Sequence, residues 1–127
     1  MEAAGEGQGE SPVDGMDDVA RGGPCCPFYH EAIELVGRRW TGAILAVLMD
    51  RPMRFSEVGQ AVPELSDRLL SARMKELEAR GIVQRTVHSG PPVRVEYSLS
   101  EMGRELGPTL SQLQEWAQRW LSRHNAV

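Results

Sequence analysis

The segment from Glu64 to Arg80, ELSDRLLSARMKELEAR, carries the residues with the clearest potential for chemistry. Its polar positions supply hydrogen-bond donors and positive charge at Arg68, Ser71, Arg73 and Lys75. Arginine and lysine are the usual readers of guanine O6 and N7 in the DNA major groove, and a serine hydroxyl can contact a base or a phosphate. A solvated surface helix is the alternative reading, in which these charges form weak surface ion pairs, for example Arg73 with Glu76 or Glu78.

The spacing of the apolar residues predicts that this segment is one amphipathic helix. Leu70, Met74 and Leu77 recur at intervals of four and three, so they share one face. Ser66 is expected to cap the start with its hydroxyl, and Gly81 to end the helix in the left-handed conformation. The polar residues then point away from the core, as a helix that enters a DNA groove requires.

The flanking sequence predicts the elements that position this helix. Residues 28–36 and 40–49 are expected to be helices, the second buried because it is apolar almost all round. A short strand over 53–55 and a helix over 56–61, capped by Ser56 and stopped by Pro63, follow. Residues 82–88 and 93–99 are expected to form a β-hairpin, since the second run alternates in polarity and a Gly-Pro-Pro turn separates the two.

This order of elements predicts a mainly α (α+β) fold, the winged helix-turn-helix with a two-stranded hairpin wing. In that plan the second helix of the pair lies in the major groove, and the wing contacts the flanking backbone or minor groove. Arg85 also places positive charge on the wing, where phosphates would lie. The candidate DNA-binding residues are Arg38, Arg39, Arg54, Ser66, Arg68, Ser71, Arg73, Lys75, His88 and Arg94.

A long final helix is expected after Ser100, which would cap it, with Gly107-Pro108 kinking or splitting it near its start. The stripe of apolar residues along this helix has more apolar surface than a small winged domain can cover. A large exposed apolar surface usually marks the binding surface of a partner. A homodimer would set two reading helices about 34 Å apart, matching a palindromic operator. Closure of the monomer core is the alternative. The candidate dimerisation residues are Phe28, Leu106, Leu110, Leu113, Trp116 and Trp120.

The charge distribution separates the chain into a tail and a domain. Net charge is −4, but residues 1–23 hold six acidic residues and one arginine. Residues 38–94 hold ten basic residues against six acidic ones, so the middle of the chain is compatible with DNA. We expect 1–23 to be a disordered acidic tail, because it has too few apolar residues to fold, and 24–127 to be the DNA-binding domain.

The two cysteines, Cys25 and Cys26, are adjacent, which does not resemble a secreted disulfide framework. Cys26 is expected at the start of the first helix, where the positive end of the helix favours a reactive thiolate. Cys26 and His30 could face one ion together with Cys25, but the spacing matches no familiar closed zinc pattern. We therefore expect no metal and no cofactor, and we leave open whether the cysteines sense anything or are structural.

Five signatures in order resemble the HxlR-type regulators, which have an architecture similar to the MarR group. They are CP near the start, GRRWTGAIL, RFSEV, LSDRLLSARMKELEARGIVQR and PPVRVEYSLSEMG, and together they cover about residues 25–121. The resemblance implies a dimeric winged helix-turn-helix transcription factor of bacteria, often a repressor and sometimes an activator. It also implies thiol sensing of oxidants or electrophiles at the cysteine before a proline, here Cys26. Met74, Ser100, Cys25 and the long tail depart from the family pattern.

The leading hypothesis is therefore a sequence-specific regulator of transcription that binds double-stranded DNA as a homodimer. A regulator that senses a small effector without its thiols, or a winged-helix protein–protein module, is the alternative. The effector could lie near Trp40, Tyr97, Trp116 or Trp120, whose simpler role is core packing. No triad, carboxylate pair or phosphate-binding loop suggests an enzyme. No membrane span or signal peptide is evident, so a cytoplasmic protein without membrane partners is expected.

Overall fold

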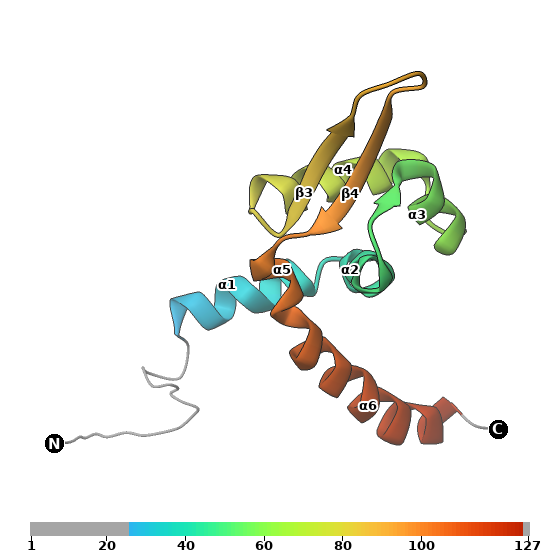
Figure 1. Ribbon diagram of the computed structural model, residues 1–127. Coiled ribbons are helices and arrows are strands. Elements are labelled where there is room, and N and C mark those ends of the chain that lie inside the picture. The colour runs from blue at the N-terminus through green and yellow to red at the C-terminus, as the bar shows by residue number, and fades with distance from the viewer. Residues whose placement is uncertain (1–25, 126–127) are drawn as a thin grey trace, which may run out of the picture. The chain divides into compact units, whose positions relative to one another are not determined.

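The computed structural model describes residues 26–125, so the expected acidic tail and Cys25 lie outside the described residues. The chain divides into two compact units between Arg38 and Arg39, and each unit is described by itself. The first unit contributes one helix, α1 (Pro27–Val36). The second unit holds all the other described elements (Figure 1).

Helix α1 begins one residue before its predicted start. Cys26 is the N-cap residue, and Pro27 occupies the first helical position, where its missing N–H removes no hydrogen bond. The helix ends at Gly37, whose N–H donates to the carbonyl of Ile33 at 2.8 Å. No residue of α1 is buried, and Phe28 is 80% exposed. The apolar side chains of this helix are therefore exposed or, at Leu35 and Val36, half-buried.

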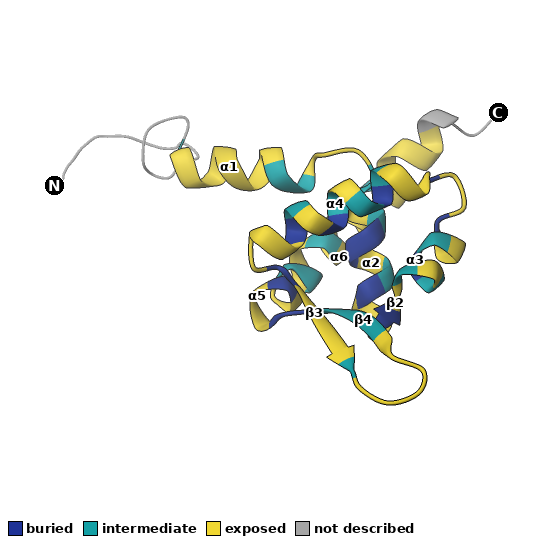
Figure 2. Ribbon diagram, turned by 90° about the horizontal axis from the view of Figure 1, so that it is seen from above, coloured by how far each residue is buried: buried dark blue, intermediate teal, exposed yellow. Residues whose placement is uncertain are grey.

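The core of the second unit is built around helix α2 (Thr41–Asp50) and helix α4 (Asp67–Ala79). Helix α2 buries Ile44, Leu45 and Leu48, which confirms its prediction as a central helix. Helix α4 buries the predicted stripe of Leu70, Met74 and Leu77, while its other side stays exposed (Figure 2). The other buried apolar residues are Met53, Val58, Val62, Leu65, Ile82, Val83 and Leu99.

The helix pair consists of α3 (Phe55–Ala61) and α4. The sequence predicts Ser56 as the cap of the first helix, but α3 begins at Phe55 with Arg54 in the N-cap position. The backbone N–H of Arg54 donates to Glu57 Oε1 at 2.8 Å, so a glutamate in the first turn reaches back to the N-cap residue, as in one half of a capping box. Helix α4 starts at Asp67 rather than Glu64, because Ser66 caps it by accepting the N–H of Leu69 at 3.1 Å.

The wing is an antiparallel hairpin of β3 (Val83–His88) and β4 (Arg94–Leu99). The short strand β2 (Met53–Arg54) adds to the free side of β4, giving one sheet in the order β2-β4-β3. The sequence predicts both the hairpin and the short strand but not their pairing, which sets Arg54 opposite Glu96. Because β2 has only two residues, its backbone N–H and C=O groups depend on β4 for hydrogen-bond partners.

The C-terminal region is divided into helix α5 (Glu101–Arg104) and helix α6 (Leu106–Asn125), which confirms the predicted split beside Gly107-Pro108. Ser100 caps α5, as predicted, by accepting the N–H of Gly103, and its hydroxyl donates to the carbonyl of Gly81 at 2.6 Å. Gly103 is buried, and a Cβ there would overlap the carbonyl oxygen of Ile82. This close approach ties α5 to the start of β3. Among the helices that the structure describes, none is long and apolar enough to cross a membrane.

Candidate nucleic-acid interface

The outward face of α4 is formed by Arg68, Ala72, Lys75 and Ala79, all of which are exposed. These positions lie on the side of the helix opposite Leu70, Met74 and Leu77, because the intervals between them follow the helical period. Two long cationic side chains alternate with two alanines, so the backbone of α4 could approach a surface closely between the two charges. Ser71 lies at the border of this face and is half-buried.

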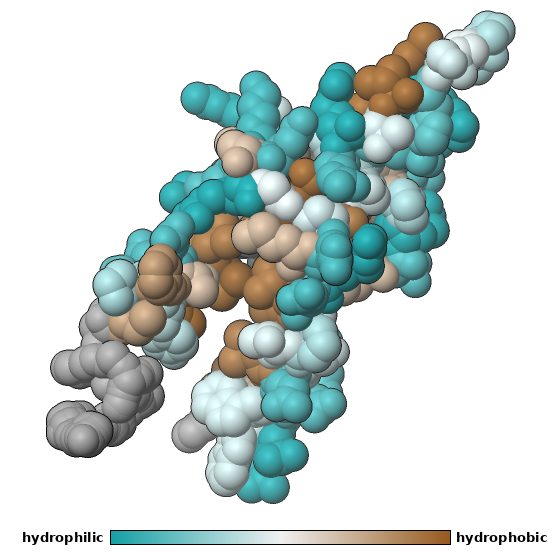
Figure 3. Space-filling model, turned by 60° about the vertical axis from the view of Figure 1, so that its left-hand side comes forward, coloured by the Kyte–Doolittle hydropathy of each residue, from teal (hydrophilic) through white to brown (hydrophobic). Residues whose placement is uncertain are grey.

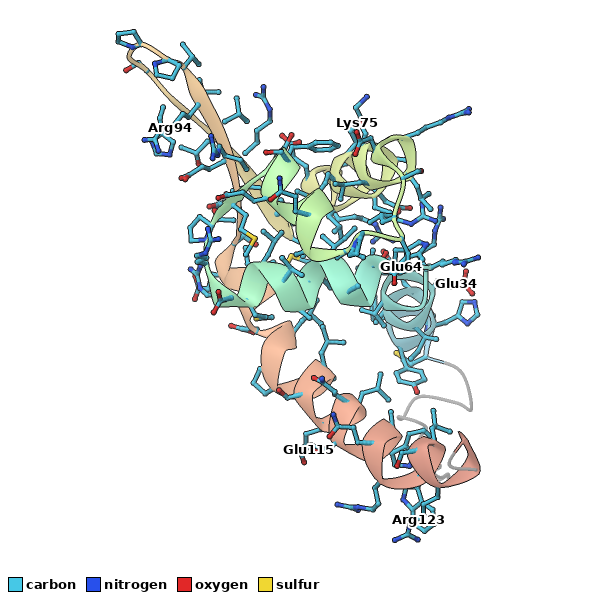
Figure 4. All side chains as sticks on the ribbon, turned by 90° about the vertical axis from the view of Figure 1, so that its right-hand side faces the viewer. Glu34, Glu64, Lys75, Arg94, Glu115 and Arg123 are labelled. Carbon is cyan, nitrogen blue, oxygen red and sulfur yellow. The ribbon has the colours of Figure 1, made fainter. Side chains whose placement is uncertain are left out.

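The wing carries further positive charge in the same unit. Arg94 is exposed at the start of β4, and Arg85 is exposed on β3. Lys75 on α4 and Arg94 on the wing extend outward at one end of the unit, while Glu115 and Arg123 lie on α6 at the other end (Figure 4). The hairpin turn contains a cis Pro91-Pro92 peptide bond. Apolar residues also reach the surface near the end of the wing, where Val87 and Val93 are exposed (Figure 3).

His88 has a partner inside the wing. Its Nε2 lies 2.9 Å from Glu96 Oε1, and Glu96 is the diagonal neighbour of His88 across the β3–β4 ladder. Cross-strand pairs of opposite charge stabilise such a ladder. The negative charge of Glu96 therefore offsets the positive charge that a protonated His88 would offer to a phosphate. Sequence reasoning missed Glu96, although the alternation of the strand and the hairpin turn could have indicated this pairing.

Arg73 is not on the exposed side of α4, where the sequence places it. Its side chain is only 12% exposed, because the residue lies three positions after Leu70 and four before Leu77, at the edge of the buried face. Nε of Arg73 donates to the carbonyl oxygen of Arg39 at 2.9 Å, and Nη1 lies 3.9 Å from Glu76 Oε1. The ion pair with Glu76 is the alternative that the sequence left open.

Three other candidate residues have structural roles in the second unit. Ser66 uses its hydroxyl as the cap of α4, and Arg54 pairs weakly with Glu57 at 3.9 Å. The guanidinium of Arg39 stacks over the ring of Trp40 at 5.3 Å from its centroid.

Trp40 itself has a φ of 76°, which is rare for a bulky residue. It is therefore the left-handed N-cap residue of α2 and not the first residue of that helix. The sequence carries no signal for this conformation. Arg38 is exposed and belongs to the first unit.

The carboxyl group of Glu57, in the first turn of α3, is held in its charged form. The hydrogen bond from the Arg54 backbone N–H is the main cause that lowers the pKa of Glu57. Desolvation by burial opposes it, and the nearby charges of Arg51 and Arg54 lower the pKa further. Glu57 therefore fixes the turn at which β2 passes into α3. This residue was not among the sequence-predicted positions, although a glutamate in a first helical turn is a common capping signal.

The candidate dimerisation residues divide into half-buried and exposed ones. Leu106 and Leu110 are half-buried near the start of α6, whereas Leu113, Trp116 and Trp120 are exposed further along the same stripe. Phe28 on α1 is also exposed. The stripe therefore lies against the core at its beginning and leaves an apolar face uncovered beyond it, and the role of that face in dimerisation stays a prediction.

Cys26 is a free, half-buried cysteine at the N-cap of α1, as its place in the sequence predicts. Its backbone carbonyl accepts the N–H of His30 at 2.9 Å, which closes the first turn. Among the side chains that the structure describes, no group of three or more histidine, cysteine or acidic residues could hold a metal ion. The metal alternative also required Cys25, which lies outside the described residues.

Comparisons with known proteins agree with this architecture. The family model for the HxlR-like helix-turn-helix matches residues 35–125. The HTH-type transcriptional regulator YodB of Bacillus subtilis is 41% identical over 106 residues, which cover 84% of this chain and 95% of YodB. YvaP of the same organism, an uncharacterized HTH-type transcriptional regulator, is 43% identical over 96 residues, covering 76% of this chain and 89% of YvaP.

Solved structures show the same similarity. The reduced form of the transcriptional regulator YodB from B. subtilis aligns with a TM-score of 0.71 at 42% identity, covering 76% of this chain and 94% of that one. The redox regulator HypR in its reduced form aligns with a TM-score of 0.69 at 35% identity, covering 76% and 97%. The relatives are regulators rather than enzymes. The chain therefore belongs to the HxlR-like helix-turn-helix family and is a DNA-binding transcriptional regulator.

Proposed function

We propose that the protein is a homodimeric repressor that binds a palindromic operator through α4 and the wing, and that it releases DNA when Cys26 is oxidised or alkylated. The observation that carries the DNA contact is the outward face of α4. Arg68 and Lys75 are exposed there, with alanines between them, while the apolar stripe is buried. Arg68 and Lys75 would contact base edges or nearby phosphates, and Arg94 would contact the backbone.

The dimer is supported by the uncovered apolar stripe of α6. Leu113, Trp116 and Trp120 are about half exposed, and aromatic residues of this size dominate the energetics of protein interfaces. A second copy of the chain would bury the stripe and give the two reading helices a fixed separation. A twofold dimer then reads an inverted repeat with half-sites about one helical turn, ~34 Å, apart.

The thiol response is supported by the position of Cys26 and by the relatives. Solved structures of YodB include a reduced, a diamide-treated and a quinone-bound form, and HypR has been solved oxidised and reduced. In this chain the thiol belongs to the N-cap residue of α1 and is half-buried. Cys26 could form a disulfide with a partner subunit or a mixed disulfide with a small thiol.

A fluorescence-anisotropy titration against DNA from upstream of the protein's own gene tests the DNA contact. Binding should weaken steeply with salt, because phosphate contacts release counterions. Affinity for this DNA should exceed that for random DNA by roughly 10³-fold or more at physiological salt. Equal affinity for both sequences would remove the claim of sequence specificity.

Diamide treatment tests the thiol response. Diamide should release wild-type protein from DNA, and Cys26→Ser should stay bound, with Cys25→Ser as the matched control that still responds. An unchanged release in Cys26→Ser would remove this thiol from the mechanism. An effector that acts without thiols would then be the better account.

A further inference from the structure

Residues 37–40 connect α1 and α2, and we call this segment the joint. Gly37 ends α1, and a Cβ there would lie 2.7 Å from the carbonyl oxygen of Ile33. Trp40 adopts the left-handed conformation with a φ of 76°. The guanidinium of Arg39 covers the ring of Trp40 at 5.3 Å. A bulky residue rarely adopts this conformation, so surrounding contacts must hold it there.

One of these contacts comes from α4. Nε of Arg73 donates to the carbonyl oxygen of Arg39 at 2.9 Å, across 34 residues of sequence. The same guanidinium lies 3.9 Å from the carboxylate of Glu76 on the next turn of α4. Because the Arg73 side chain is mostly buried, its position is constrained from both ends, by α4 and by the joint. The carbonyl that it holds belongs to the residue immediately before the strained Trp40.

We propose that Arg73 is a positioning residue that couples the seating of α4 on DNA to the conformation of the joint at Arg39 and Trp40. When α4 adjusts its position against a DNA groove, Arg73 moves the Arg39 carbonyl and, with it, the peptide plane and ring of Trp40. The coupling is reciprocal, so a change of the joint alters the affinity of α4 for DNA. The proposal rests on the proposed function only in taking α4 as the helix that binds DNA.

The test uses the full chain labelled with 5-fluorotryptophan. The protein has three tryptophans, so ¹⁹F NMR gives a small set of resonances, which single Trp→Phe variants assign. On saturation with the specific DNA, the Trp40 resonance of wild type should shift. In Arg73→Met it should shift by less than half as much, although the variant still saturates at a higher DNA concentration. Loss of one charge-assisted hydrogen bond should weaken its binding roughly tenfold.

Two variants separate coupling from other effects. Arg68→Met makes the same chemical change on the exposed side of the same helix, and it should weaken binding while leaving the full Trp40 shift. Arg73→Lys keeps a donor for the Arg39 carbonyl and should recover most of the shift, which decides the matter even if Arg73→Met does not fold.

Saturable binding without a Trp40 shift in wild type, or an undiminished shift in Arg73→Met, would overturn the coupling alone. An Arg73→Lys protein that binds DNA but lacks the shift would also overturn it. If anisotropy shows no saturable DNA binding by wild type, the proposed function fails as well, and with it the coupling.

Discussion

Helices α4 and α6 are both amphipathic, yet they use their apolar faces differently. In α4 the stripe of Leu70, Met74 and Leu77 is buried within the chain, and what remains outside is charged residues and alanines. In α6 the stripe continues past the core, and Leu113 is 56% exposed whereas Leu70 is 0% exposed. The same periodic pattern thus has two outcomes, because within the described residues the stripe of α4 is covered along its length, whereas the stripe of α6 is covered only near its start.

The contrast indicates what each helix does. A helix whose apolar face is satisfied can present its polar face to another molecule without disturbing the fold. A helix whose apolar face is uncovered requires an apolar partner, and a second copy of the chain is the simplest one. This contrast is the basis of our proposal that α4 reads DNA and that α6 joins two copies of the chain.

The largest expected effect comes from truncating the buried stripe. Leu70→Ala should lower the free energy of unfolding by about 2–5 kcal/mol, because it leaves a cavity in the core. Leu113→Ala removes the same atoms from an exposed site and should change monomer stability by less than about 1 kcal/mol. Urea unfolding at low protein concentration measures both values, and equal losses would break the contrast between the helices.

A charge placed on the α6 stripe should act on assembly rather than on folding. Trp120→Glu should weaken the dimer by about 2 kcal/mol or more, roughly thirtyfold in the dissociation constant, because it replaces an interface aromatic residue with a carboxylate. Sedimentation equilibrium reports the change. Gln118→Glu adds the same charge to the other side of α6 and serves as the control, and a similar loss in both variants would contradict the assignment.

Charge removal on α4 and on the wing should separate base reading from phosphate contact. Arg68→Ala should cost about 1–3 kcal/mol of specific binding with less effect on random DNA, if it reads a base. Arg94→Ala should weaken both alike and reduce the salt slope by about one, if it meets a phosphate. Anisotropy titrations at several salt concentrations measure both variants. If the two variants lose the same affinity for specific and random DNA and have the same salt slope, Arg68 and Arg94 make the same kind of contact.

The smallest effect concerns the turn that leads into the helix pair. The pKa of Glu57 is lowered in the folded state, mainly by the Arg54 backbone N–H, so its contribution to stability is fully present above the ordinary glutamate pKa of about 4.3. This contribution disappears as the pH falls through the lower folded-state value. Glu57→Gln should therefore be slightly less stable than wild type near pH 7, and the difference should vanish in acid. Thermal unfolding as a function of pH measures it, and a constant difference would contradict the role of the charge.

Sequence periodicity was sufficient for the elements and for the buried face of α4, because the positions of Leu70, Met74 and Leu77 repeat with the helical period. It was not sufficient for residues whose roles depend on distant partners. Arg73 binds a carbonyl 34 residues away, and β2 pairs with β4 across two helices. The left-handed Trp40 was equally hidden, since this conformation is imposed by its surroundings and not by its residue type.

Selection of binding sites from random DNA tests most directly whether α6 joins two copies so that their α4 helices read one operator. If α6 joins two copies in this way, selection should enrich an inverted repeat whose half-site centres lie about one helical turn, roughly 10 base pairs, apart. Trp120→Glu should select no such repeat under the same conditions. Enrichment of a single unrepeated motif by the wild-type protein would contradict the account.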